Sequence, residues 1–186
     1  MKKGLILMLV AVVALSMLSG CGGSKSTSTT SPYNELMKMA KAIREAGGIA
    51  DVGQGQSSRE DIARQKAQNN GRQQLALALE SKIQVLQKSF LEEIGSALET
   101  EVNEAFTSVS KTMASTTLRG VFPEEERMVS KDGLITIYVL MAMDPATFNQ
   151  SFLDELQSKP KVYERFRASQ AYDELKGEME AYESQE

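Results

Sequence analysis

The sequence predicts an α+β fold, in which a small, mostly antiparallel three-stranded sheet packs against one long helix, with shorter flanking helices. Two observations lead to this prediction. Apolar residues recur in steps of three and four from Ile62 to Met113, which is the spacing of one helix face. Short extended patterns lie on either side of that stretch, at residues 48–53 before it and at residues 118–129 and 134–143 after it.

The elements before the long helix have clear local signals. An amphipathic pattern of apolar and charged residues predicts a first helix over residues 33–46. The first strand follows, and residues 54–56 are predicted to form a turn. Ser57 and Glu60 have the spacing of a capping box, Ser-x-x-Glu, which predicts that the long helix begins there.

Two glycines after the first strand, Gly53 and Gly55, imitate the start of a dinucleotide-binding fingerprint. The third glycine of that pattern would fall at position 58, which is serine, and no strand with an acidic end follows about twenty residues later. Nucleotide binding is therefore not expected. We interpret the glycines as positions that let the chain turn and the helix lie close on the strand, and Gly71 as a further position of close packing.

The apolar stripe of the long helix does not stay on one face. Beyond Phe90 it drifts by about 140° through Met113, at 100° per residue, so one straight helix on one sheet does not satisfy it. Two explanations remain open. Either the helix breaks near Gly95 and all its apolar residues enter one core, or its distal half faces another subunit. The candidate oligomer contact consists of Leu98, Val102, Phe106 and Val109.

A hairpin follows the helix. Residues 130–133, Ser-Lys-Asp-Gly, are a turn signal between the two strands. The second of these, at residues 134–143, is almost wholly apolar, which predicts a central strand covered on both faces. Pro123 lacks an amide hydrogen, so its strand is expected at an edge or at a bulge. Carboxylates at residues 124–126 point to alternate faces of a strand, which favours a solvated edge over a metal site.

The last third of the chain is predicted to be helical. Asp144 followed by Pro145 is the start signal of a helix over residues 146–156. After Pro160, a charged extension over residues 161–186 has apolar positions that suit a partly packed or partner-seeking helix.

The N-terminus predicts an export signal that ends in a lipid attachment site. Lys2 and Lys3 precede a charge-free, mostly apolar run over residues 4–18, which is shorter than the about 20 residues that cross a bilayer. The run ends in Leu18-Ser19-Gly20-Cys21, which resembles the lipobox of bacterial lipoproteins. The resemblance implies that residues 1–20 are a signal peptide, cleaved before Cys21, and that Cys21 carries a covalent diacylglycerol and palmitate lipid anchor.

The chain after the cleavage site is predicted to have three parts. Residues 21–32 are predicted to form a flexible Ser/Thr-rich tether, residues 33–160 the α+β domain, and residues 161–186 the C-terminal extension. Gly22 resembles the sorting signal for the outer membrane in bacteria with two membranes. We therefore expect a lipid-anchored protein at the outer membrane that faces the periplasm or the surface.

The composition narrows the chemistry. The chain has no histidine and only one cysteine, Cys21, so Ser-His-Asp and Cys-His sites and the usual zinc sites are not available. We expect no enzyme, no metal and no cofactor other than the lipid. The formal charge is −4 and falls by two when Lys2 and Lys3 are removed, which argues against nucleic acid as a partner.

The element order together with the lipobox resembles the Lpp-twenty family of small bacterial lipoproteins, which includes flagellar assembly lipoprotein P. The likeness covers about residues 49–148. Its motifs are Gly53 and Gly55, the alanine-bearing helix over residues 61–79 with Arg72 and Leu75-Ala76, Leu118-Arg119-Gly120, and Ile137-Tyr138-Val139-Leu140-Met141 before Asp144.

The resemblance implies a non-catalytic structural or assembly protein, a scaffold of the cell envelope, with the flagellum as one possible setting. Its partners would be the membrane, through the lipid anchor, and either copies of itself in an oligomer or another envelope protein. The alternative is a periplasmic binding module for a small apolar ligand, which a methionine-rich lining would hold: Met113, Met128, Met141 and Met143.

Overall fold

The protein is described by a computed structural model, which places residues 31–116 and 121–184. Residues 31–186 form one compact unit. The signal peptide, the lipobox with Leu18, Ser19, Gly20 and Cys21, and nearly all of the tether lie outside the described residues, as do residues 118–120 of the predicted strand. Within the described part of the chain, no helix is long and apolar enough to cross a membrane.

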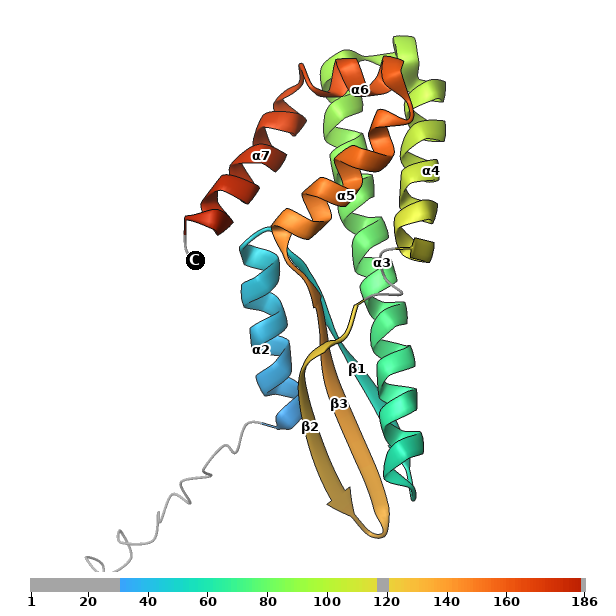
Figure 1. Ribbon diagram of the computed structural model, residues 1–186, viewed down its shortest axis with the longest axis vertical. Helices are drawn as coiled ribbons and strands as arrows, with labels where there is room; N and C mark the ends of the chain where they lie inside the picture. Colours follow the sequence, from blue (N-terminus) through green and yellow to red (C-terminus); the bar gives the residue numbers. More distant parts are fainter. Residues whose placement is uncertain (1–30, 117–120, 185–186) are drawn as a thin grey trace, which may run out of the picture. The chain divides into compact units, whose positions relative to one another are not determined.

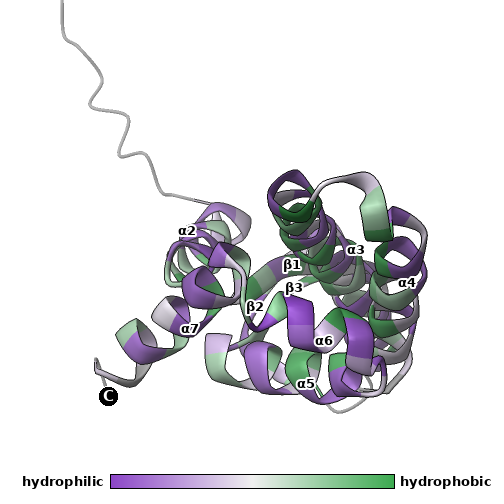
Figure 2. Ribbon diagram, turned by 90° about the horizontal axis from the view of Figure 1, so that it is seen from above, coloured by the Kyte–Doolittle hydropathy of each residue, from purple (hydrophilic) through white to green (hydrophobic). Residues whose placement is uncertain are grey.

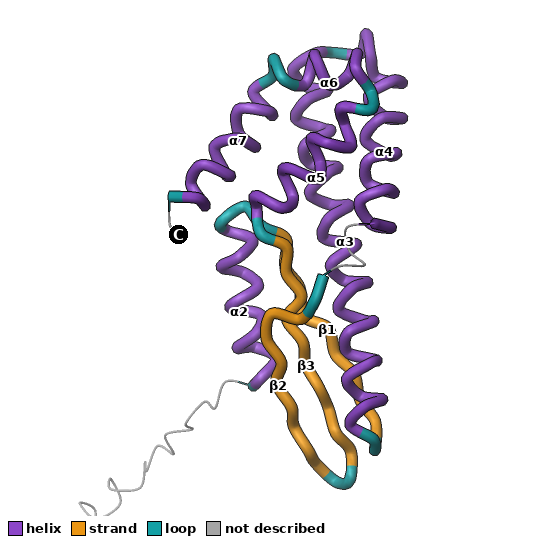
Figure 3. The backbone as a smooth tube through the Cα atoms, in the orientation of Figure 1, coloured by secondary structure: helices purple, strands orange, loops and turns teal. Residues whose placement is uncertain are grey.

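The fold is α+β, as predicted, with a three-stranded antiparallel sheet of order β1-β3-β2 (Figures 1 and 3). The strands are β1 (Ile49–Ser57), β2 (Pro123–Lys131) and β3 (Leu134–Met143). The long helix α3 (Glu60–Ile94) packs on one face of the sheet, and α2 (Pro32–Glu45) packs on the other. The central strand is therefore β3, as its apolar sequence predicted.

Side chains of β3 alternate between the two helices. Val139 and Met141 are buried in the larger core with α3, whereas Leu140 and Ala142 are buried in a smaller cluster with α2. A strand that is covered on both faces must be apolar at successive positions, because a polar residue on either side would lose its water. The run from Ile137 to Met143 meets this requirement.

The first strand is longer than predicted, and the turn at residues 54–56 was wrong. β1 continues through these residues, where Gln54 pairs with Tyr138 and Gln56 with Thr136. The capping box was also wrong. Ser57 is the last residue of β1, and its hydroxyl accepts a hydrogen bond from the amide of Arg59 instead of closing the helix.

Glycines and alanines bring β1 and α3 into backbone contact. A Cβ atom on Gly53 would lie 2.3 Å from the carbonyl oxygen of Ala67 and 2.3 Å from the amide nitrogen of Gly71. A Cβ atom on Gly55 would lie 2.2 Å from the carbonyl oxygen of Ala63. Close approach of the helix to the strand, the role expected of these glycines, is confirmed.

The polar residues beside Gly71 have a role in the same contact. The side-chain oxygen of Asn70 on α3 accepts a hydrogen bond of 3.0 Å from the amide of Gln54 on β1. Since β1 is an edge strand, this bond satisfies a backbone donor for which the sheet has no partner. A poor helix-forming residue is thus used to cover part of a sheet edge.

The turn and the edge strand of the β2–β3 hairpin agree with the sequence prediction, and only the start of β2 differs. Asp132 and Gly133 both have positive φ angles, 53° and 75°, which is the backbone of a two-residue turn that matches strand twist. β2 is an edge strand with a bulge between Pro123 and Glu125, so both expectations for the proline hold. The strand begins at Pro123, later than predicted.

The long helical stretch breaks at Gly95, where the φ angle is 71°. A short 3₁₀ turn (Ser96–Leu98) leads into α4 (Glu99–Thr116), which packs back against α3. The candidate oligomer contact is corrected by this break. Val102, Phe106 and Val109 are buried in the core of their own chain, and Leu98 packs partly buried against it.

The C-terminal helices complete the end of the molecule away from the hairpin. They are α5 (Pro145–Gln157), α6 (Pro160–Phe166) and α7 (Gln170–Glu183). Asp144 caps α5 as predicted, since its carboxylate accepts a hydrogen bond of 2.7 Å from the amide of Thr147. Seen from above, α3, α4, α5 and α6 surround a common interior (Figure 2).

The residues after Pro160 form two helices that pack against the preceding elements, which agrees with the partly packed alternative for this segment. Phe166 is fully buried, and its ring lies 5.4 Å from that of Phe90, 5.5 Å from that of Phe152 and 5.9 Å from that of Phe106. Leu175 of α7 is buried in the same core. The amphipathic pattern of this segment is satisfied inside the fold.

Candidate functional site

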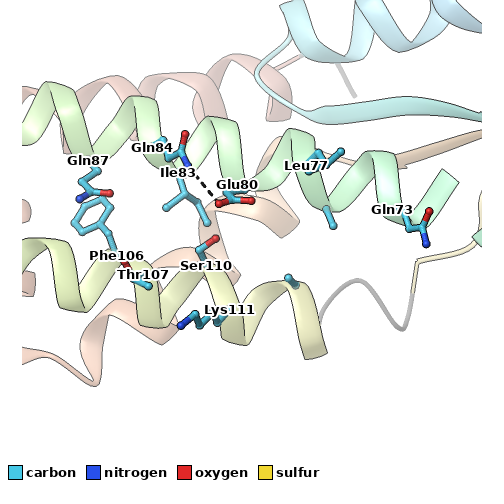
Figure 4. Close-up of a pocket in the computed structure, with 12 residues that line it drawn as sticks. Gln73, Leu77, Glu80, Ile83, Gln84, Gln87, Phe106, Thr107, Ser110 and Lys111 are labelled. Atoms are coloured by element: carbon cyan, nitrogen blue, oxygen red, sulfur yellow. Dashed lines mark hydrogen bonds between the residues drawn. The ribbon is translucent and has the colours of Figure 1, made fainter. Parts of the chain in front are cut away.

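A groove lies between α3 and α4 in the described part of the chain, with a volume of about 690 Å³ (Figure 4). It exists because the facing positions of the two helices carry small side chains. Ala76 of α3 and Ser110 and Ala114 of α4 are among the lining residues, and side chains of this size leave space between two helix backbones. We refer to this hollow as the α3–α4 groove.

The α3–α4 groove has an apolar floor and a polar rim. Ile83 and Phe106, which are almost completely buried, contribute to the floor. Leu77 also lines the groove and is 60% exposed. The rim consists of amides, hydroxyls and two charged groups: Gln73, Glu80, Gln84, Gln87, Thr107, Ser110 and Lys111.

Two rim contacts define the shape of the groove. The side-chain amide of Gln84 donates a hydrogen bond of 3.3 Å to Glu80, along the wall formed by α3. The amide of Gln87 donates to the side-chain oxygen of Asn103 at 2.5 Å, which joins α3 to α4 near the helix break. A long open groove with this lining suits an amphipathic segment of another protein better than an enclosed small molecule.

Two carboxylates of the acidic run at residues 124–126 pair with arginines. Glu126 accepts hydrogen bonds of 3.0 and 3.1 Å from Arg64 of α3, and Glu125 forms an ion pair with Arg127. The hydrogen bonds from Arg64 to Glu126, and then to Glu60, raise the pKa of the guanidinium further above its usual range. The described residues contain no group of three potential metal ligands.

A partly buried lysine joins α3 to α7 and to the turn between α2 and β1. Lys82 of α3 donates a hydrogen bond of 2.5 Å to the carbonyl oxygen of Gly47 and one of 2.6 Å to Glu178 of α7. Its ammonium also lies 4.7 Å from the centre of the Phe148 ring. With 18% of its side chain exposed, Lys82 has a structural role that connects α3, α7 and the start of β1.

The four methionines that were proposed to line a ligand cavity do not lie together in the structure. Met113, Met141 and Met143 are buried in the core, and Met128 is 54% exposed on β2. Met141 is packed so closely that its Cγ atom lies 2.6 Å from where a Cβ atom of Gly71 would be. None of the four methionines lines the α3–α4 groove.

Sequence reasoning did not find the α3–α4 groove or the role of Lys82. The groove left a weak signal, because Leu77 is an apolar residue that does not belong to the buried stripe of α3. Lys82 has no comparable signal. Its partners come from three other elements, and nothing in the neighbouring sequence indicates them.

Comparison of the chain with profiles of known protein families, with characterised proteins and with solved structures found no match. Its function is therefore inferred from its residues and their arrangement.

Proposed function

We propose that this chain is a bacterial lipoprotein, anchored at the outer membrane by a lipid on Cys21, and that it acts as a non-catalytic scaffold or assembly component of the cell envelope. The observation that carries the proposal is the lipobox, Leu18-Ser19-Gly20-Cys21. It stands ten residues ahead of Ser31, where the compact unit begins. This spacing leaves a short polar tether between an anchor and a folded domain.

The surface of the domain supports a role in protein contact. The α3–α4 groove combines an apolar floor with a rim of amides, which can exchange hydrogen bonds with a polar backbone or side chain. Leu77 is exposed beside it. The likeness to small envelope lipoproteins, with the flagellum as one possible setting, leads to the same class of function.

The anchor is tested with the full chain in a bacterial host with two membranes. We expect mass spectrometry of the mature N-terminus to show cleavage before Cys21 and the mass of a diacylglycerol with acyl chains. A Cys21→Ser variant should keep the signal peptide, take up no labelled palmitate and leave the outer-membrane fraction. Unchanged fractionation and an unmodified thiol on Cys21 would contradict the proposal.

The scaffold role is tested by substitution in the α3–α4 groove. Leu77→Glu places a charge in the groove, whereas Val85→Glu places one on the same helix outside it, and the two residues are similarly exposed, at 60% and 66%. We expect cross-linking in intact cells to capture a discrete complex that Leu77→Glu abolishes and Val85→Glu retains. Equal cross-linking by both variants would argue against a partner in the groove.

A further inference from the structure

The described chain enters the fold at the middle of the β2–β3 hairpin. The ring of Tyr33, in the first turn of α2, lies 6.0 Å from that of Tyr138 on β3. Glu35 lies 3.9 Å from Arg127 on β2. From there α2 runs toward the helical end of the molecule, while the hairpin continues the other way to its turn (Figures 1 and 3). The hairpin turn is thus on the same side as the start of the domain.

The hairpin reaches about as far as the tether does. Tyr138 and Gly133 are five residues apart, which corresponds to about 17 Å along a strand. A flexible polar chain of ten residues, the number from Cys21 to Ser31, would typically span about 17 Å, and at most about 35 Å. A lipid on Cys21 would therefore leave the hairpin turn within reach of the membrane surface.

The end of the hairpin exposes apolar side chains. Of the eight large apolar residues that are exposed in the described chain, Met128, Val129 and Leu134 lie within seven residues of each other at this turn. The strand register pairs Lys131 with Leu134 and Val129 with Thr136, so Val129 and Leu134 lie on the sheet face whose other half α2 covers. This part of the face has no covering element among the described residues. Met128 pairs with Ile137 and lies on the opposite face.

These observations point to one occupant. We propose that the end of the β2–β3 hairpin, residues 128–134, rests on the membrane that holds the lipid anchor, with the helical end of the domain turned away from it. The inference depends on the proposed anchor and deepens it by assigning an orientation.

The contact is apolar in character. The charges of Lys131 and Asp132 at the turn offset each other, so a net charge does not provide the attraction. The partly exposed side chains of Val129 and Leu134 can enter the boundary between head groups and acyl chains, while Lys131 on the same face lies level with the phosphates. Such a contact is weak alone, but the tether keeps the hairpin at a high effective concentration near the bilayer.

Neither competing occupant fits this face as well. The tether itself, residues 22–30, is made of Gly, Ser, Lys and Thr, and it offers no apolar side chain to cover the face. A second copy paired along the edge of β2 would bring together two strands that each begin with charged residues 124–127. Both remain distinguishable outcomes in the experiment below.

The test uses the full lipidated protein in vesicles of phosphatidylethanolamine and phosphatidylglycerol. Because the thiol of Cys21, the only cysteine, is blocked by lipid, Ser130→Cys supplies a single site for an environment-sensitive fluorophore. Ser96→Cys is the matched control, an exposed serine in the turn between α3 and α4 at the other end of the domain. We expect nitroxide lipids to quench the label at position 130 several-fold more than the label at position 96.

Three results would overturn the orientation. Equal, weak quenching at both positions means that the domain stands clear of the bilayer. Stronger quenching at position 96 means the opposite orientation. A label at position 130 that is shielded from water but not quenched by lipid means that the tether or a second copy covers the hairpin.

A second variant and a check of the anchor complete the design. Val129→Glu combined with Leu134→Glu should reduce quenching at position 130 to the level at position 96, whereas Val85→Glu should leave it unchanged. Vesicle flotation and the N-terminal mass report the anchor separately. A protein that floats but is not quenched refutes only the orientation, and a protein without lipid refutes both proposals.

Discussion

The two ends of this molecule are held together in opposite ways. At the sheet end, β1 and α3 touch through their backbones, because Gly53, Gly55 and Gly71 have no side chains to separate them. At the helical end, the interior is filled by large aromatic rings that meet mostly edge to face: Phe90, Phe106, Phe148, Phe152 and Phe166. One end depends on the absence of side chains, and the other on their bulk.

The backbone contact at the sheet end and the aromatic packing at the helical end predict that the two ends tolerate different substitutions. A backbone contact has no side chain that can move aside, so an added methyl group must displace a helix or a strand. An aromatic cluster loses stability when a ring is removed, because the cavity that remains closes only partly. The predictions below test this contrast in order of expected effect.

The largest effect is expected from Gly53→Ala. The new Cβ atom would lie 2.3 Å from backbone atoms of both Ala67 and Gly71, so α3 must move off the sheet. We expect a loss of at least about 4 kcal/mol in the free energy of unfolding, which is exceptional for one methyl group. Urea denaturation followed by circular dichroism measures it. A variant within about 1 kcal/mol of the parent would show that the contact can relax.

Phe166→Ala tests the other end. Phe166 has four aromatic neighbours and is fully buried, so its removal leaves a cavity at the junction of α3, α4, α5 and α6. We expect a loss of about 3–5 kcal/mol in the free energy of unfolding by urea denaturation. Phe122→Ala is the control, because that ring is 75% exposed and should change stability little. Equal effects of the two variants would refute the role of the cluster.

Lys82→Met tests the connection from α3 to α7 and to the turn between α2 and β1. The substitution keeps most of the apolar stem but removes the hydrogen bonds that the ammonium group donates to the carbonyl of Gly47 and the carboxylate of Glu178. We expect a loss of about 1–3 kcal/mol and faster hydrogen exchange in α7, which loses a partner on α3. The control is Lys88→Met, on the same helix, with a side chain that is 79% exposed. Unchanged exchange in α7 would contradict the assignment.

The same contrast explains what the sequence could predict. The cap at Asp144, the turn at Asp132-Gly133 and the edge position of Pro123 are local, because each is decided by the backbone preferences of a few residues. The break at Gly95 was left open between two explanations. The drift of the apolar stripe showed that the helix changes partners there, but not whether the partner lies in the same chain.

The errors came where tertiary contact overrides local signals. Gly53-Gln54-Gly55 has the composition of a turn, but α3 holds it in a strand by packing on both glycines and by the bond from Gln54 to Asn70. For the last two helices the sequence left open packing within the fold or binding to a partner, and Phe166 and Leu175 lie in the core. The α3–α4 groove, as a space between helices, depends on how their axes cross and so has no local signature.

The smallest effect is expected from Gly177→Ala, and it has the opposite sign. Gly177 lies within α7, and a Cβ atom there would meet open space, with no atom within 4 Å. Alanine should stabilise the fold by about 0.5–1 kcal/mol, because glycine loses more backbone freedom in a helix. Thermal unfolding should shift upward by roughly 1–4 °C. An added methyl group is thus expected to disrupt the contact of Gly53 with α3 but to stabilise α7 at Gly177. A loss of stability in Gly177→Ala would mean that α7 packs more closely than its exposed glycine indicates.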